Sequence, residues 1–323
     1  MTEVLHKENL KRALERVKRN KGAPGIDGMT VDELGSHLKA NWPSIRAQLV
    51  AGTYQPKPVT RVEIPKPDGR KRLLGIPTVV DRFIQQTVAQ VVQQQWEPHF
   101  HPNSYGFRPG RNAHQAMHHA QATIRQGYGW VVDIDLEAFF DRVNHDRLMV
   151  RVRKHVDAPD VLQLINRFLK GGVQVNGQTQ ATVQGVPQGG PLSPVLANVV
   201  LDELDWALDA RGHCFARYAD DCNIFVKSQT MGQRGIPRVK ETRGHCARGL
   251  EHKQKRAWAM APEQNASTES GTARKVVSSN GVARTGTGQG NMRSTTCQGT
   301  AGYVTRMSGG VGGRGREASS YPD

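Results

Sequence analysis

Residues 130–136 read Trp-Val-Val-Asp-Ile-Asp-Leu, and residues 215–226 read Phe-Ala-Arg-Tyr-Ala-Asp-Asp-Cys-Asn-Ile-Phe-Val. The first run predicts a buried β-strand, and the second predicts two short strands that meet at an acidic turn. Both runs carry carboxylates at positions where a buried strand would normally have apolar residues. Because burying an unpaired carboxylate is costly, such a group normally has a cation or a metal ion as its partner.

Asp135, Asp220 and Asp221 are therefore the candidate site residues. A single Asp at a strand end is more often a solvated turn residue, and we keep that interpretation for Asp133. Taken together, the candidate residues favour a metal site, because an adjacent acidic pair beside a third carboxylate supplies the hard oxygen ligands that Mg²⁺ prefers. Phosphoryl transfer by two metal ions requires such a set.

The sequence before these strands predicts two helices and a hairpin. Apolar residues at helical spacing predict a basic helix near the N-terminus, which the glycines of residues 22–28 end, and a second helix over residues 81–96. Arg61–Ile64 and Arg72–Ile76 flank Pro67-Asp68-Gly69, which is typical of two strands joined by a tight turn. The arms of this hairpin are cationic.

Residues 185–194 read Gly-Val-Pro-Gln-Gly-Gly-Pro-Leu-Ser-Pro, and we call them the glycine-rich link. They predict a turn followed by a helix with Ser193 as its N-cap. Gly189 and Gly190 would let a ligand approach the backbone, and Gln188 would offer its amide to a nucleotide or a template. A plain turn is the commoner role of such a segment.

Charge and composition narrow the class of protein. Among 323 residues, 44 Lys and Arg outnumber 29 Asp and Glu, and the formal net charge of +15 favours a polyanionic partner such as nucleic acid. Residues 229–323 contain no Phe and show no apolar periodicity, so we expect this tail to be largely disordered. The four cysteines have no CxxC spacing, which favours a reducing compartment. Without a leader or an apolar span in the pattern, we expect a cytoplasmic protein with no membrane partner.

Six segments in order resemble the reverse transcriptase domain of group II intron-encoded proteins. They are residues 20–29 (Asn-Lys-Gly-Ala-Pro-Gly-Ile-Asp-Gly-Met), 64–77 (Ile-Pro-Lys-Pro-Asp-Gly-Arg-Lys-Arg-Leu-Leu-Gly-Ile-Pro), 103–110 (Asn-Ser-Tyr-Gly-Phe-Arg-Pro-Gly), 135–141 (Asp-Leu-Glu-Ala-Phe-Phe-Asp), 187–189 (Pro-Gln-Gly) and 218–221 (Tyr-Ala-Asp-Asp). The last three resemble polymerase motifs A, B and C. The resemblance implies an α+β fold, with right-hand polymerase fingers and palm and an antiparallel palm sheet.

The same resemblance divides the chain into three parts. Residues 1–60 would be an N-terminal extension and the start of the fingers, and residues 61–228 the fingers and palm of the reverse transcriptase. Residues 229–323 would be an atypical Gly- and Arg-rich tail, since the resemblance ends near Lys227. We expect the family's primer grip, thumb and maturase region to be missing, which would leave an edge of the palm sheet uncovered and make activity weak or absent. A shifted reading frame is one hypothesis for this tail.

The resemblance also implies a reaction and its partners. Asp135, Asp220 and Asp221 would be the catalytic ligands of two Mg²⁺ ions in an RNA-directed DNA polymerase, a nucleotidyltransferase. The partners would be an intron RNA template, a DNA primer and deoxynucleoside triphosphates. The alternative is a non-catalytic, maturase-like remnant that binds intron RNA. A retron-type enzyme is disfavoured by the N-terminal segment.

Further residues acquire nucleotide-binding roles only through the resemblance. Lys66 and Arg72 would contact the triphosphate, a role that suits a point cation and a forked guanidinium. Phe140 would occupy the sugar-gate position and exclude a 2′-hydroxyl. Gln188 and Gly189 would contact the incoming nucleotide and the template.

Overall fold

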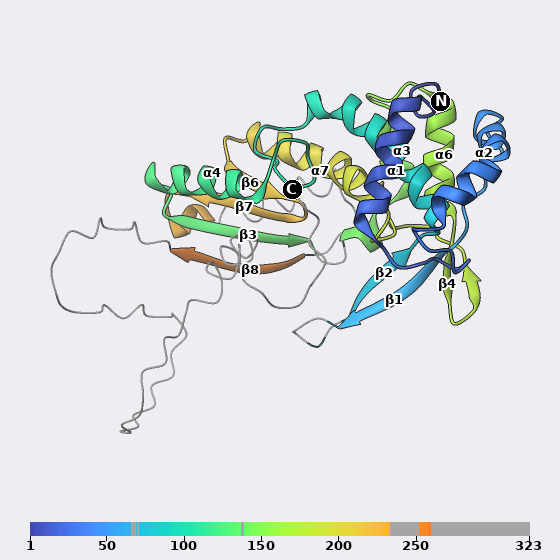
Figure 1. The fold of residues 1–323 in the computed structure, drawn as a ribbon. Helices are drawn as coiled ribbons and strands as arrows, with labels where there is room; N and C mark the ends of the chain where they lie inside the picture. The colour runs from blue at the N-terminus through green and yellow to red at the C-terminus, as the bar shows by residue number, and fades with distance from the viewer. Residues whose placement is uncertain (66–68, 70, 137–138, 233–251, 260–323) are drawn as a thin grey trace, which may run out of the picture.

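The computed structural model describes residues 1–65, 69, 71–136, 139–232 and 252–259 (Figure 1). Its helices are α1 (Lys7–Asn20), α2 (Leu34–Val50), α3 (Val79–Trp96), η1 (Glu97–His99), α4 (Ala113–Arg125), η2 (Phe139–Arg142), α5 (His145–Val152), α6 (Pro159–Lys170) and α7 (Ser193–Asp209). Its strands are β1 (Val59–Pro65), β2 (Lys71–Ile76), β3 (Trp130–Leu136), β4 (Val173–Val175), β5 (Gln178–Gln180), β6 (Cys214–Tyr218), β7 (Asp221–Val226) and β8 (His252–Ala259).

The strands form two sheets that lie at different ends of the molecule (Figure 1). The palm sheet has the order β6-β7-β3-β8, and all of its pairs are antiparallel. The fingers sheet has the order β2-β1-β4-β5 and contains a parallel pair between β1 and β4. The α+β fold with an antiparallel palm sheet, expected from the sequence, is confirmed.

Local sequence patterns account for most of these elements. β3 has the bounds predicted from its apolar run, and β1 and β2 pair antiparallel as the hairpin pattern predicted. The helix predicted from residue 81 begins at Val79, because the Thr78 side chain caps it by accepting from the Asp81 backbone N–H over 3.1 Å. Residues 66–68 and 70 of the predicted hairpin turn lie outside the described residues.

The start of α7 differs from the prediction. Its N-cap is Leu192, and Ser193 is already inside the helix. The Ser193 hydroxyl instead donates to the Pro187 carbonyl over 2.6 Å. The serine therefore holds the glycine-rich link folded back on the helix, a role that a capping pattern alone does not reveal.

β8 corrects the expectation of an uncovered palm edge. This strand, from the segment predicted to be disordered, pairs antiparallel with β3, with a register shift between Val132 and Ile134. A ladder is made of backbone hydrogen bonds, so a segment without apolar alternation can still add a strand. The rest of the predicted disorder, in 233–251 and 260–323, lies outside the described residues.

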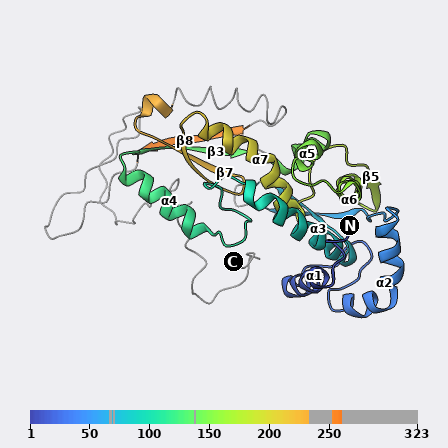
Figure 2. The ribbon, with the colours of Figure 1, turned by 90° about the horizontal axis from the view of Figure 1, so that it is seen from above.

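The two faces of the palm sheet have different packing. Val132, Ile134 and Leu136 of β3 belong to the main core, as do the buried apolar residues of α7. Val131, together with Phe225 and Ala216 of the neighbouring strands, forms a smaller cluster that α4 helps to cover. Figure 2 shows α7 running across the strands while α4 lies to one side of them. The palm sheet is thus packed on one face by α7 and on the other by α4.

None of the helices in the described part of the chain combines the length and the apolarity that crossing a bilayer requires.

Candidate active site

The strand register brings the predicted acidic residues to one end of the palm sheet. Asp135 in β3 lies directly opposite Asp221 in β7, and Tyr218 in β6 lies opposite Asp221 on the other side. Cα atoms of opposed residues in an antiparallel ladder are about 4.5–5.5 Å apart. Ala219 and Asp220 form the turn that joins β6 to β7. The three acids predicted from the sequence are therefore neighbours in the fold.

The chemistry of these acids fits a divalent cation. Asp220 and Asp221 are both half-buried, and the structure describes Asp135 by its backbone. Among the residues whose side chains are described, no three His, Cys, Asp or Glu converge as a metal-binding group, and Asp135 lies outside that set. Adjacent carboxylates opposite a third supply only hard oxygen donors, which suit Mg²⁺ rather than a softer metal.

Asp133 is not the turn residue that we expected. It lies in the middle of β3 opposite Asn223 of β7, and it is half-buried. The ladder with β8 shifts register at this position. A turn preference is a local tendency, and here pairing on both sides of β3 overrides it.

The turn itself has an unusual backbone. Ala219 has φ +58°, the left-handed region that L-residues rarely adopt. Gly106 lies against this turn so closely that a Cβ on it would be 2.2 Å from the Ala219 nitrogen. Residues 103–105 form a further, short pairing beside β6: the Tyr105 N–H donates to the Arg217 carbonyl and the Arg217 N–H donates to the Asn103 carbonyl, each over 2.9 Å. The segment of residues 103–110 therefore borders the acidic turn.

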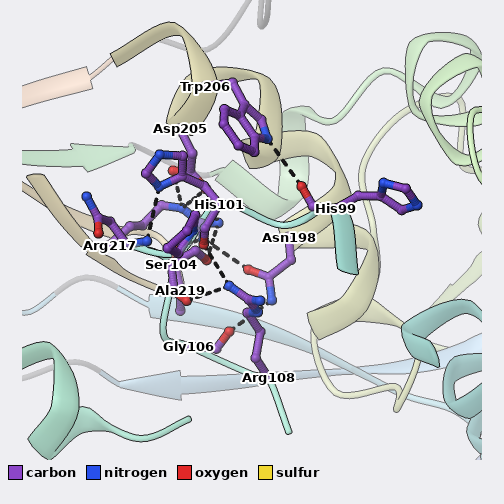
Figure 3. Close-up of polar contacts among 12 residues, drawn as sticks. His99, His101, Ser104, Gly106, Arg108, Asn198, Asp205, Trp206, Arg217 and Ala219 are labelled. Carbon is purple, nitrogen blue, oxygen red and sulfur yellow. Dashed lines mark hydrogen bonds and ion pairs between the residues drawn. The ribbon is translucent and has the colours of Figure 1, made fainter. Parts of the chain in front are cut away.

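A buried polar cluster lies behind the turn, and Figure 3 shows its members. Arg217 forms an ion pair with Asp205 of α7, and both side chains are 0% exposed. Although burial alone would lower the pKa of Arg217, the neighbouring Asp205 carboxylate raises it above its ordinary value. Asn198, a fully buried residue of α7, accepts a hydrogen bond from the same guanidinium over 3.0 Å. The cluster therefore places a paired guanidinium and carboxylate in the core of the palm.

Sequence reasoning missed this cluster. Its signal was present. Arg217 interrupts an apolar strand, and Asn198 and Asp205 lie seven positions apart in the next helix along the chain toward the N-terminus, which places them on the same helical face. Polar residues at such positions need partners when they are buried. Which partners they find depends on the path of the chain.

Three of the residues assigned to nucleotide binding come together where the fingers sheet meets the palm. The Arg72 Nε donates to the Gln188 Oε1 over 3.1 Å, and the Gly75 N–H donates to the Gln188 carbonyl over 2.7 Å. Gly189 has φ +124°, and a Cβ on it would be 2.8 Å from the Gly75 carbonyl oxygen. Lys66, another residue of this set, lies outside the described residues.

Phe140 lies on η2, the short helix that follows β3 in the chain. It is half-buried, and its ring packs edge-on against the Phe139 ring, with centroids 5.2 Å apart. Its carbonyl accepts from the Val186 N–H over 2.6 Å, at the start of the glycine-rich link. The backbone of Phe140 is thus tied to the segment that carries Gln188 and Gly189.

An antiparallel palm sheet with paired acids at one end, joined to a cationic hairpin through a glycine-rich link, defines the fingers and palm of a nucleic-acid polymerase. The family model "Reverse transcriptase (RNA-dependent DNA polymerase)" matches residues 64–259. The chain belongs to this family. The match includes β8, so the expectation that the resemblance ends near Lys227 is wrong.

Individual relatives agree with this assignment. Protein YkfC of Escherichia coli (strain K12) is 37% identical over 214 residues, which are 64% of this chain and 56% of YkfC. The group II intron-encoded protein LtrA of Lactococcus lactis subsp. cremoris is 38% identical over 197 residues, 60% of this chain and 32% of LtrA. The resemblance to group II intron reverse transcriptases is confirmed over that part of the chain. The chain spans only about half of YkfC and a third of LtrA.

Among solved structures, a chain of a partial Cas6-RT-Cas1–Cas2 complex is similar with a TM-score of 0.43 and 24% identity, covering 75% of this chain and 40% of that one. A likeness of this size adds nothing to the assignment.

Proposed function

We propose that the chain is an RNA-directed DNA polymerase of the group II intron type that extends a DNA primer along an intron RNA template. The observation that carries the proposal is the β3–β7 register, which sets Asp135 opposite Asp221 and next to the turn that contains Asp220. These acids are the proposed ligands of two Mg²⁺ ions. When bound, the ions would activate the primer 3′-hydroxyl and neutralise charge on the α-phosphate and the pyrophosphate.

The residues of the chain divide the remaining work. The carboxylates fix where the primer end and the α-phosphate meet, and the rigid palm sheet holds them there. Arg72 and Lys66 are proposed to bind the triphosphate, since a guanidinium fork and an ammonium both suit phosphate oxygens. Gly189, which has no side chain, lets the nucleotide approach the backbone beside Gln188. Phe140 is proposed to crowd a 2′-hydroxyl and so to select deoxynucleotides.

β8 supports a folded palm, because it pairs with the edge of β3 that would otherwise expose unpaired backbone groups.

The test is primer extension on RNA with Mg²⁺, using the full chain and its Asp220→Asn variant. We expect extension by the chain and a loss of about 1,000-fold or more in the variant, since one electrostatic group at a reacting centre contributes about 10²–10³ and a metal ligand more. RNA affinity should be unchanged. Asp146→Asn, at an exposed Asp of α5, is the matched control. If the chain binds RNA but shows no extension that the Asp220→Asn change abolishes, the result would instead support the non-catalytic, maturase-like function.

A further inference from the structure

We propose that Arg217, Asp205 and Asn198 are positioning residues that hold the acidic turn in the conformation that binds metal. This inference rests on the proposed function of the turn, and it assigns a role to residues outside the acidic set. It begins from the contacts of one side chain, the guanidinium of Arg217 (Figure 3).

All the N–H groups of Arg217 are used inside the protein. Nε donates to both carboxylate oxygens of Asp205, over 2.7 and 3.0 Å, and Nη2 donates to Asp205 over 2.6 Å and to the Ser104 hydroxyl over 2.7 Å. Nη1 donates to the Asn198 Oδ1 over 3.0 Å and to the Ala219 carbonyl over 2.8 Å. A guanidinium has five N–H donors in a fixed planar fork, so these contacts fix its position as well as its charge.

The contact with Ala219 is the one that reaches the site. The Ala219 carbonyl belongs to the peptide group that joins Ala219 to Asp220, so its direction sets where the Asp220 backbone begins. Ala219 has φ +58°, and an alanine remains in that region only when its surroundings hold it there. The bond from Arg217 is such a restraint.

Ala219 is restrained from a second side by the same cluster. The Gly106 backbone packs so closely against the Ala219 nitrogen that a Cβ on Gly106 would not fit. The Gly106 carbonyl accepts a hydrogen bond from the Asn198 Nδ2 over 2.9 Å. Asn198 therefore links Gly106 to Arg217. Figure 3 shows Arg217 and Asn198 facing each other, with Ala219 and Gly106 lower in the view.

A role in stability alone does not account for this arrangement. A buried ion pair often stabilises a fold no better than apolar residues of the same size. Asp205 already neutralises the charge of Arg217. The bonds to Asn198 and Ala219 add no charge compensation and instead fix the orientation of the groups that accept them. The first of these directional bonds to reach the turn is the one to Ala219, which precedes Asp220, and Asn198 reaches the same residue through Gly106.

The experiment compares Arg217→Lys with Arg108→Lys in the full chain. Arg108 is also buried and bonds the carbonyls of His101 and Ser104 in the neighbouring loop. No contact that the structure describes for it involves Ala219. Mn²⁺ affinity is measured by electron paramagnetic resonance, and amide hydrogen exchange is measured over residues 218–222. Melting temperatures of the two variants control for a general loss of stability.

We expect Arg217→Lys to weaken Mn²⁺ binding about 10- to 100-fold, as loss of a residue that orients a metal ligand does, and to speed exchange in the turn. Arg108→Lys should leave Mn²⁺ affinity within about twofold. Adding Ala219→Gly to Arg217→Lys should restore part of the affinity, because glycine adopts a positive φ without restraint. Equal effects of the two Arg variants, or no recovery with glycine, would overturn the proposal.

A variant that does not fold and a failure of the proposed function can be distinguished from a failure of this inference. If Arg217→Lys does not fold, Asn198→Ala is used instead, because it removes the bonds to Gly106 and Arg217 and leaves the ion pair intact. We then expect the same changes, with a smaller loss of Mn²⁺ affinity. If the unaltered chain binds no Mn²⁺ through Asp220, the proposed function fails. Hydrogen exchange in the turn then still decides whether Arg217 holds it.

Discussion

The Arg72 guanidinium donates to the Gln188 side chain across the junction between β2 and the glycine-rich link. Both side chains are proposed to bind the nucleotide, and in the structure each is bonded to the other. The contact is exposed, so it exchanges easily for another partner. The Gly75 N–H also donates to the Gln188 carbonyl, which keeps the two segments aligned. The fingers hairpin and the link therefore present one continuous surface.

We predict that Arg72→Ala raises the KM for deoxynucleotide roughly tenfold or more, because a hydrogen bond between charged groups contributes about 1.5–3 kcal/mol. The matched control is Arg61→Ala. Arg61 lies opposite Gly75 and Arg72 lies opposite Ile64, so the two arginines belong to opposite faces of the hairpin. Steady-state kinetics on a primed RNA checks this. An equal rise in KM for both variants would show that general positive charge is responsible.

Gly189 tests how closely the link approaches β2. Replacing it with alanine places a Cβ 2.8 Å from the Gly75 carbonyl oxygen at φ +124°. We expect a loss of about 2–4 kcal/mol in the free energy of unfolding, from backbone strain together with overpacking. Gly177→Ala is the control: its φ is +80°, and a Cβ there meets nothing within 4 Å. That variant should lose only about 1 kcal/mol. Urea unfolding measures both, and similar losses would contradict the prediction.

Gly106 gives the corresponding test at the acidic turn. A Cβ there would lie 2.2 Å from the Ala219 nitrogen and 2.9 Å from its Cα, so Gly106→Ala must displace backbone. We predict that Mn²⁺ affinity falls at least about tenfold, as when a metal ligand loses its orientation. Gly110→Ala, in the same loop, has φ +68° and open space around its Cβ. It should retain the affinity of the unaltered chain, and a loss there as large as at Gly106 would mean that the loop acts only through stability.

The elements that the sequence predicted well are those with a local cause. β3 followed from a run of apolar residues, and the β6–β7 turn followed from adjacent acids between two apolar segments. Local periodicity determines which residues can be buried, and it does so without knowledge of distant parts of the chain. The acidic residues could be singled out for the same reason, because a carboxylate within such a run stands out.

The features that the sequence did not predict depend on contacts between distant residues. Ser104 and Arg217 are bonded although more than a hundred positions separate them, and no local pattern connects them. β8 pairs through its backbone, for which its polar sequence gave no sign. Ser193 has the composition of an N-cap, yet the fold of the preceding link gives its hydroxyl another acceptor. In each case tertiary structure overrides local preference.

Asp202, on α7, has an altered acidity that stability measurements can detect. Burial, and then the nearby Asp205 carboxylate, raise its pKa from 3.8 to about 6. Its Oδ1 has no hydrogen-bond partner among the described residues. The folded chain therefore favours the neutral acid, whereas the unfolded chain ionises it at the ordinary pKa.

The sign of the pH effect follows from these two values. Below pH 3.8 the group is protonated in both states, so its contribution to stability is fully present. As the pH rises to about 6, the unfolded chain gives up the proton first, and that contribution is lost. Since the group is partly open to solvent, screening reduces the loss to about 1 kcal/mol.

We predict that Asp202→Asn removes this step, because an amide does not ionise and keeps similar size and polarity. The variant should be more stable than the unaltered chain by about 1 kcal/mol at pH 7.5, and the advantage should shrink as the pH falls toward 4. Urea unfolding at several pH values measures it, with Asp32→Asn, at an exposed Asp, as the control. Because the control carboxylate is solvated in both states, its replacement should shift stability little at any pH. A constant advantage of Asp202→Asn across the range would assign the effect to packing rather than to a proton.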